Sequence, residues 1–299
     1  MKFISGSIAV IFALISILYL LNSPPYANCL PHFESVFFLK ISNKMVLLIS
    51  TISLLMLYLS SLTSLGTIMV YFVTICLAIL TLIKLYILIN IKLVICSFFI
   101  GGLIGLTNKF IALHSTSWSI LSSIITILFF ISGVILVNHT KLINIPSLEG
   151  KVKKGGLLFL YGILISIPFA LFNHLGGMYK HDDWITYWWQ PLAALKAGIY
   201  EETFFRLFLA TFFYALMRPI FKSNPKNAIV LVVLFSSFLF VISHMGFNIP
   251  AQIVGLIIFS IPKALFYIKY GFEFAIGFHF FNDFVRYTAA YLLFSNGQA

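Results

Sequence analysis

The sequence predicts an all-α, polytopic membrane protein, a bundle of about eight to ten transmembrane helices. Of its 299 residues, 61% are hydrophobic and 9% are charged, whereas soluble domains carry about 25% charged residues. Apolar runs recur at about the 20 residues that a helix needs to cross a bilayer. The period-2 alternation typical of an outer-membrane barrel is absent. This composition excludes a cytosolic enzyme, a nucleic-acid-binding protein and a disordered chain.

Ten candidate spans follow one another along the chain. They are approximately 3–22, 45–64, 67–84, 88–106, 116–137, 155–174, 190–217, 227–246, 250–268 and 272–295. The count stays at eight to ten because residues 64–106 form an almost unbroken apolar block that can be divided in more than one way. We expect a boundary near residue 150, since the unusual polar residues concentrate in 151–299 and the spans in 1–150 contain few polar groups.

Basic residues predict the orientation, because Lys and Arg collect in short cytoplasmic loops. The net charge is +11, and the loops after residues 138 and 217 are basic, so both are expected to be cytoplasmic. Between them, the segment 179–189 contains acidic residues and three Trp, which suits the opposite interface. We therefore interpret the basic excess as membrane flanks and expect no nucleic-acid partner.

Charged residues lie inside the predicted span 190–217. Glu201, Glu202 and Arg206 are far from both of its ends, and each charged group at bilayer depth costs about 2.5–3.5 kcal/mol. Glu202 and Arg206 are four residues apart, which permits an ion pair. Glu201 is turned about 100° from Glu202 around a regular helix, so it can face elsewhere. The alternative is a buried ion-pair cluster that only fixes helix packing.

Two further spans carry polar residues of the same chemical kind. His244 ends one apolar span, at about the same depth as Glu201, roughly 26 Å from the basic margin. His279 and Asp283 share a face of the last span, since they are four residues apart. Structural alternatives are an interfacial His244 and an Asp283 that pairs with Arg286. A convergent site of Glu201, His244, His279 and Asp283 could activate water and stabilise an oxyanion.

Three motifs in this order resemble a known family. They are Glu-Glu-x-x-x-Arg at 201–206, Phe-x-x-x-His at 240–244, and His with Asp four residues later at 279–283. The region 190–295 is similar to the CAAX protease and bacteriocin-processing (CPBP) family of intramembrane, metal-independent glutamate-type proteases. That family includes CAAX prenyl protease 2 and proteins like lysostaphin resistance protein A. The resemblance implies that 151–299 is a catalytic transmembrane core.

The resemblance also implies a role for each matched position. Glu201 and His244 would activate water, His279 and Asp283 would stabilise the oxyanion, and Glu202 and Arg206 would support the first helix. Two positions depart from the family pattern. Leu207 stands where Gly often follows the Arg, and Asp283 stands where many prenyl endopeptidases have an amide. An ionised Asp283 would repel an oxyanion unless it is protonated, paired with His279, or replaced in this role by Asn282.

These observations predict an intramembrane endopeptidase that cleaves a membrane-associated peptide or protein, of CAAX type or another small peptide, and needs no cofactor. One rival is a zinc protease with Glu201, His244 and His279 as ligands, although the His-Glu-x-x-His helix is absent. Other rivals are a non-catalytic bacteriocin-immunity or binding protein and a transporter. Abundant Ile, Lys and Asn indicate an AT-rich genome, so we expect the chain in a bacterial plasma membrane.

Overall fold

The computed structural model of this chain describes residues 64–177, 182, 184–221, 224–245 and 249–294. Within these ranges all regular elements are helices and no strand occurs, which confirms the predicted all-α class. The predicted span 3–22 lies outside the described residues, as does 45–64 except for its last residue. The division near residue 150 and the orientation in the membrane stay predictions.

The first described helices precede the basic loop at 141–151. They are α3 (Ser64–Leu85) with the short 3₁₀ turn η1 (Tyr86–Leu88), α4 (Ile91–Leu106) with the π segment η2 (Thr107–Ile111), and α5 (Thr116–Thr140). The side chain of Asn90 caps α4 by accepting a hydrogen bond from the amide of Leu93. Lys141 ends α5 in the left-handed conformation, with φ of 56°. The backbone amide of Lys141 donates to the carbonyl oxygen of Val137, so the side chain of Asn90 and the amide of Lys141 each satisfy one helix terminus.

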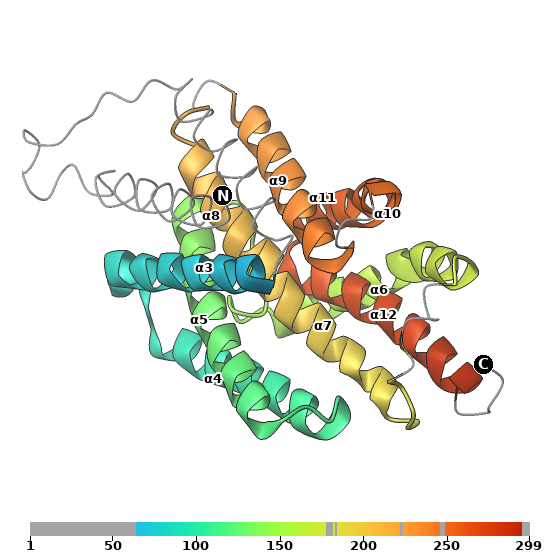
Figure 1. The fold of residues 1–299 in the computed structure, drawn as a ribbon. Coiled ribbons are helices and arrows are strands. Elements are labelled where there is room, and N and C mark those ends of the chain that lie inside the picture. Colours follow the sequence, from blue (N-terminus) through green and yellow to red (C-terminus); the bar gives the residue numbers. More distant parts are fainter. Residues whose placement is uncertain (1–63, 178–181, 183, 222–223, 246–248, 295–299) are drawn as a thin grey trace, which may run out of the picture.

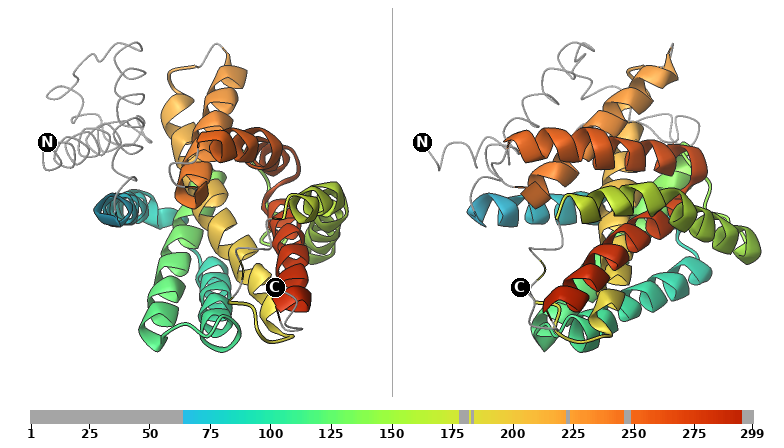
Figure 2. Two further views of the ribbon diagram at one scale, coloured as in Figure 1. Left: turned by 45° about the vertical axis from the view of Figure 1, so that its right-hand side comes forward. Right: turned by 90° about the vertical axis from the view of Figure 1, so that its right-hand side faces the viewer.

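The later helices are α6 (Val152–Leu175), then a continuous helix of η4 (Gln190–Ala193), α7 (Ala194–Glu201), η5 (Glu202–Ala210) and α8 (Thr211–Met217). They are followed by α9 (Pro225–Met245), by α10 (Ile249–Val254), η6 (Gly255–Ser260) and α11 (Ile261–Tyr270), and by α12 (Phe272–Phe294). Figure 1 shows α7 and α8 as one ribbon through the bundle. Figure 2 shows α10 and α11 as one helix.

Six of the described helices are long and apolar enough to cross a membrane. Their spans are Tyr71–Leu88, Ile91–Ile111, Thr116–Thr140, Val152–Leu175, Pro225–His244 and Pro250–Tyr270. This count is lower than the predicted eight to ten. Two of the predicted spans fall outside the described residues except at residue 64, and the predicted spans 190–217 and 272–295 are helical but contain several charged residues. The chain is therefore an integral membrane protein by length and composition of its helices.

Glycine allows α12 to approach both α6 and α7 closely. A Cβ at Gly162 of α6 would collide with the carbonyl oxygen of Phe274, and one at Gly277 of α12 would collide with the carbonyl oxygen of Phe159. A Cβ at Gly198 of α7 would lie 3.1 Å from the carbonyl oxygen of Ile276. Small residues at crossings let membrane helices pack backbone to backbone. These contacts hold the charged segments of α7 and α12 side by side.

Two π segments, η5 and η6, lie next to each other in the centre of the C-terminal helices. The segment η6 comes just before Pro262, which has no amide hydrogen and cannot continue a regular helical hydrogen-bond ladder. The segment η5 begins at Glu202, directly after Glu201. Such insertions occur frequently at functional sites because they redirect side chains from their regular helical positions.

Candidate active site

Glu201 and Glu202 are consecutive residues with different surroundings. Glu201 is the last residue of α7, and Glu202 is the first residue of the π segment η5. The side chain of Glu201 is 21% exposed, whereas that of Glu202 is completely buried. The helix therefore presents one carboxylate to an accessible space and the other to the protein interior.

The carboxylate of Glu201 lies between two histidines from different helices. Its Oε2 atom is 3.0 Å from Nε2 of His244 and 3.6 Å from Nε2 of His279. The short contact with His244 confirms that α7 and α9 bring these two residues to the same depth. An acid placed between two imidazoles can exchange a proton with either of them.

His244 is oriented by the last turn of α9. Its Nδ1 atom lies 2.7 Å from the carbonyl oxygen of Phe240 and 2.9 Å from Oγ of Ser243. Because a carbonyl oxygen only accepts, Nδ1 donates to it and Nε2 is turned toward Glu201. The ring also stacks on Phe240, with centroids 4.2 Å apart. Its side chain is 38% exposed, so substrate can reach this side of the pair.

Glu202 lies in a buried group of polar side chains, the inner cluster, which consists of Glu202, Arg206, Ser236, Ser260 and Lys263. Nε of Arg206 is 3.7 Å from Oε2 of Glu202, so the predicted ion pair forms. Arg206 also donates hydrogen bonds to the hydroxyls of Ser236 and Ser260, and each of these bonds is 2.9 Å long. A buried guanidinium needs this number of acceptors because removal from water is costly.

Lys263 and His279 complete the surroundings of Glu202. Nζ of Lys263 is 3.3 Å from Oε1 of Glu202, and Nδ1 of His279 is 2.8 Å from the same oxygen. Both side chains are almost fully buried. His279 therefore has one ring nitrogen in the inner cluster and the other directed toward Glu201.

Asp283 lies next to His279, one turn further along α12. Its Oδ2 atom is 3.5 Å from Nε2 of His279, and its Oδ1 atom is 3.7 Å from Nη1 of Arg286. Both pairings considered from the sequence thus occur together. Arg286 also reaches Asp182 in the loop before α7, with 2.8 Å between Nε and Oδ2. The positive charge of Arg286 is consequently shared between two carboxylates.

Asn282 precedes Asp283 and contacts a different helix. Its Oδ1 atom accepts a hydrogen bond of 2.8 Å from Nδ2 of Asn173, on α6. Because its oxygen is used in this way, the amide group of Asn282 is oriented with its nitrogen as the remaining donor. Asn282 is therefore placed to donate a hydrogen bond close to Asp283.

A cavity of about 250 Å³ connects these groups. Its lining includes Glu201, His244, His279, Asn282 and Asp283 together with Lys263, Arg286 and Asn173. Aromatic and small residues of α9, η6 and α12 form the rest of the wall, namely Phe240, Val241, Gly255, Phe259 and Tyr287. Polar groups that converge on a cavity with an aromatic part to its wall are typical of a ligand site.

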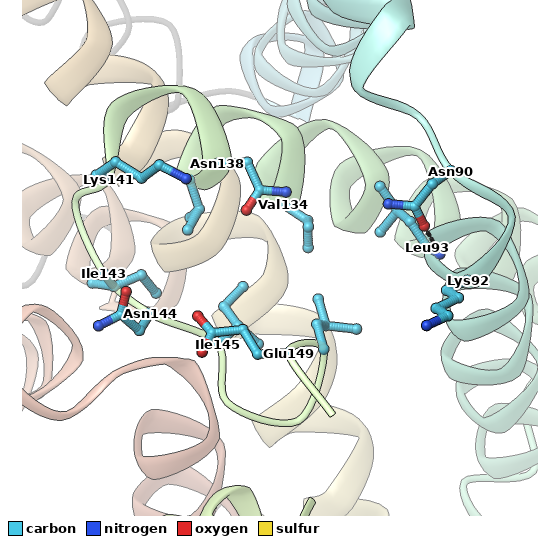
Figure 3. A pocket seen from close by; sticks show the side chains of 12 residues that line it. Asn90, Lys92, Leu93, Val134, Asn138, Lys141, Ile143, Asn144, Ile145 and Glu149 are labelled. Atoms are coloured by element: carbon cyan, nitrogen blue, oxygen red, sulfur yellow. Dashed lines mark hydrogen bonds between the residues drawn. The ribbon is translucent and has the colours of Figure 1, made fainter. Parts of the chain in front are cut away.

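A second cavity, of about 130 Å³, has a different character. It lies between the start of α4, the end of α5 and the loop that follows α5, and its lining includes Lys92, Lys141 and Glu149. Figure 3 shows the two lysines on different sides of this space. No histidine lines it, so it offers no acid and imidazole pair comparable with Glu201 and His244.

The structure brings together all seven residues singled out in the sequence, which are Glu201, Glu202, Arg206, His244, His279, Asn282 and Asp283. Their chemical roles stay predictions. The sequence did not predict the presence of Lys263 and Asn173 at the site, or the ion pair between Asp182 and Arg286. Lys263 could have been found as a charged residue inside an apolar span, but Lys263 lies outside all three motifs. Among the described residues, no group of three or more His, Cys, Asp or Glu is arranged to hold a metal ion.

Comparison with known proteins finds a family to which the region of this site is similar. Residues 183–285 match the family described as type II CAAX prenyl endopeptidase Rce1-like, which confirms the resemblance predicted from the three motifs. No match was found among curated proteins or solved structures. The matched segment is about a third of the chain and contains Glu201, His244, His279 and Asp283.

Proposed function

We propose that this protein is an intramembrane endopeptidase in which Glu201 and His244 activate a water molecule for attack on a peptide carbonyl. The substrate is a membrane-associated peptide or protein, and the proposed location is a bacterial plasma membrane. The observation that carries this proposal is the position of Oε2 of Glu201, 3.0 Å from Nε2 of His244 at the wall of the cavity.

The first step requires a base beside the attacking water. Nδ1 of His244 donates to the carbonyl oxygen of Phe240, so a single proton is shared between Nε2 and the carboxylate of Glu201. A water molecule that binds beside this pair, on the cavity side, loses a proton to Glu201 as its oxygen attacks the carbonyl carbon. The same proton then passes to the nitrogen of the leaving amine, which completes hydrolysis.

The second requirement is a donor for the oxyanion that forms on the carbonyl oxygen. Nδ1 of His279 donates to Glu202, and in the imidazolium form of the ring Nε2 also carries a proton, which points toward Glu201 and Asp283. This proton and the amide of Asn282 can stabilise an oxyanion in the cavity. Arg286 offsets the charge of Asp283, which reduces its repulsion of the same oxyanion. No metal or other cofactor is part of this proposal.

The proposal is tested by comparing the termini of membrane proteins in cells that produce the parent chain with those in cells that produce Glu201→Gln. We expect a set of new termini that is present with the parent and lost with the variant, at equal amounts of membrane-inserted protein. Termini that persist in the variant would contradict the role of Glu201.

The same experiment separates hydrolysis from binding. If the parent creates no new termini but binds a peptide or protects cells from one, the proposed endopeptidase is wrong and a binding or immunity protein is supported. A matched control is Glu149→Gln, since Glu149 is exposed and pairs only with nearby Lys151 in the structure described. This control is expected to produce the parental termini.

A further inference from the structure

Lys263 is a buried cation that the three sequence motifs do not include. It lies on α11, between the second and third motifs, and only 4% of its surface is exposed. It also lines the cavity that contains Glu201 and His244. Lysine is rarely buried to this extent unless it is paired, so its contacts indicate what holds it there.

Nζ of Lys263 forms a triangle with two polar atoms of other side chains. Its Nζ atom is 3.3 Å from Oε1 of Glu202 and 3.2 Å from Nδ1 of His279. The third side of this triangle is the 2.8 Å contact between Nδ1 of His279 and Oε1 of Glu202. An ammonium group donates only, so it favours an ionised Glu202 that accepts from both neighbours. With Glu202 ionised, the ring of His279 keeps its Nδ1 proton and directs Nε2 toward Glu201 and Asp283.

The same ammonium group also touches the aromatic ring that supports His244. Nζ of Lys263 lies 3.9 Å from the centroid of Phe240, within the range of a cation–π interaction. Phe240 stacks on His244 at 4.2 Å and meets His279 edge to face at 5.8 Å. One side chain therefore contacts His279 directly and reaches His244 through a single intervening ring.

Arg206, the other cation of the inner cluster, has a different set of partners. It contacts Glu202 through Nε at 3.7 Å, and its other nitrogens donate to Ser236 and Ser260. Those serines belong to α9 and η6, so Arg206 joins helices. Lys263 instead contacts an imidazole that faces the cavity. The contacts of Lys263 can therefore position a group of the site, whereas those of Arg206 only join helices.

We propose that Lys263 is a positioning residue of the active site, which sets the orientation and the donor pattern of His279 and supports His244 through Phe240. This inference rests on the proposed endopeptidase function. It predicts that the charge of Lys263 affects the rate of the chemical step more than it affects substrate binding.

The test uses purified full-length protein in detergent and a fluorogenic peptide that spans a cut site identified from the membrane-protein termini. Lys263→Met is expected to lower kcat about 10- to 100-fold while KM changes by less than about twofold. Lys263→Arg restores the charge and is expected to give a kcat between those of the parent and Lys263→Met. Lys269→Met changes an exposed lysine on the same helix and is expected to match the parent.

A double variant distinguishes positioning from simple charge balance. Glu202→Gln with Lys263→Met removes both charges of the pair but also leaves the buried Arg206 without its anion, so we expect no gain in thermal stability over Lys263→Met alone. Its kcat should stay low, since His279 loses both the ionised acceptor and the neighbouring cation. Recovery of both stability and kcat would show that Lys263 only balances charge and would overturn the inference.

Failure of this inference can be told apart from failure of the proposed function. If the parent hydrolyses the peptide, Glu201→Gln does not, and a stably folded Lys263→Met retains the parental kcat, then only the role of Lys263 is wrong. An equal kcat for Lys263→Arg and Lys263→Met would also contradict it, because the charge would then have no effect. If Glu201→Gln remains as active as the parent, the proposed water-activating group itself is wrong.

Discussion

The two sides of the polar site differ in exposure and in the kind of partner they provide. The inner cluster around Glu202 and Arg206 is completely buried, and its carboxylate lies between two cations. On the cavity side, Glu201 is 21% exposed and His244 is 38% exposed, and the carboxylate lies between two imidazoles. In the described part of the chain, His279 is the side chain that contacts both carboxylates, through different ring nitrogens.

Because their exposure and partners differ, these two adjacent glutamates can have separate tasks. A carboxylate held between two cationic side chains is a poor proton acceptor, because its negative charge is already stabilised. A carboxylate beside imidazoles, at the wall of a cavity, can exchange protons with water and substrate. The inner cluster thus fits a supporting role and the cavity side fits the chemical step.

The largest effect is expected for His244→Ala, on the cavity side. Loss of the imidazole removes the partner that shares a proton with Glu201, so kcat should fall about 1,000-fold with little change in thermal stability. The measurement is peptide hydrolysis by purified protein, with His114→Ala, a change in the exposed loop before α5, as a control. Retention of more than a tenth of the parental kcat would contradict water activation by this pair.

Arg206→Met is expected to act on stability instead. It leaves the buried Glu202 with one cation instead of two, and breaking such a buried pair costs about 3–5 kcal/mol. A large decrease in the thermal unfolding midpoint should appear in detergent or bilayer nanodiscs, whereas Arg218→Met, outside the inner cluster, should have a much smaller effect. Unchanged stability together with lost activity would place Arg206 in the chemical step and would remove the distinction between the two sides.

A smaller effect is expected for Asp283→Asn. The amide removes a charge that opposes the oxyanion and can itself donate a hydrogen bond, so kcat should stay within about tenfold of the parent. Asp283→Ala lacks this donor and should lose about 100-fold. Comparison of the two kcat values decides whether the carboxylate is needed in its ionised form, since an Asn variant as impaired as the Ala variant would show that it is.

The smallest effect is expected from metal chelation. Prolonged dialysis against a strong chelator should leave peptide hydrolysis unchanged, because the proposed reaction uses Glu201 and His244 without a metal ion. The metal content of the purified protein should be measured in parallel. Loss of activity that zinc restores would support the rival in which Glu201, His244 and His279 bind zinc.

Helical periodicity predicted much of this arrangement. The spacing of His279 and Asp283 placed both on one face of α12, and the distances of Glu201 and His244 from the basic margin indicated equal depth. Periodicity did not predict the π segment that starts at Glu202, because no local residue pattern determines where an extra helical residue is accommodated. Lys263 was also missed, since its meaning depends on packing between α11, η5 and α12 rather than on any local spacing.

The separate tasks of the two glutamates are tested most directly by comparing Glu201→Gln with Glu202→Gln in purified protein, with kcat and the thermal unfolding midpoint measured for both. We expect Glu201→Gln to keep the parental midpoint and to lose at least about 1,000-fold in kcat. Glu202→Gln should lower the midpoint, since it leaves Arg206 and Lys263 without their shared buried anion. The claim is contradicted if Glu201→Gln retains activity, or if it is the variant that unfolds while Glu202→Gln keeps the parental stability.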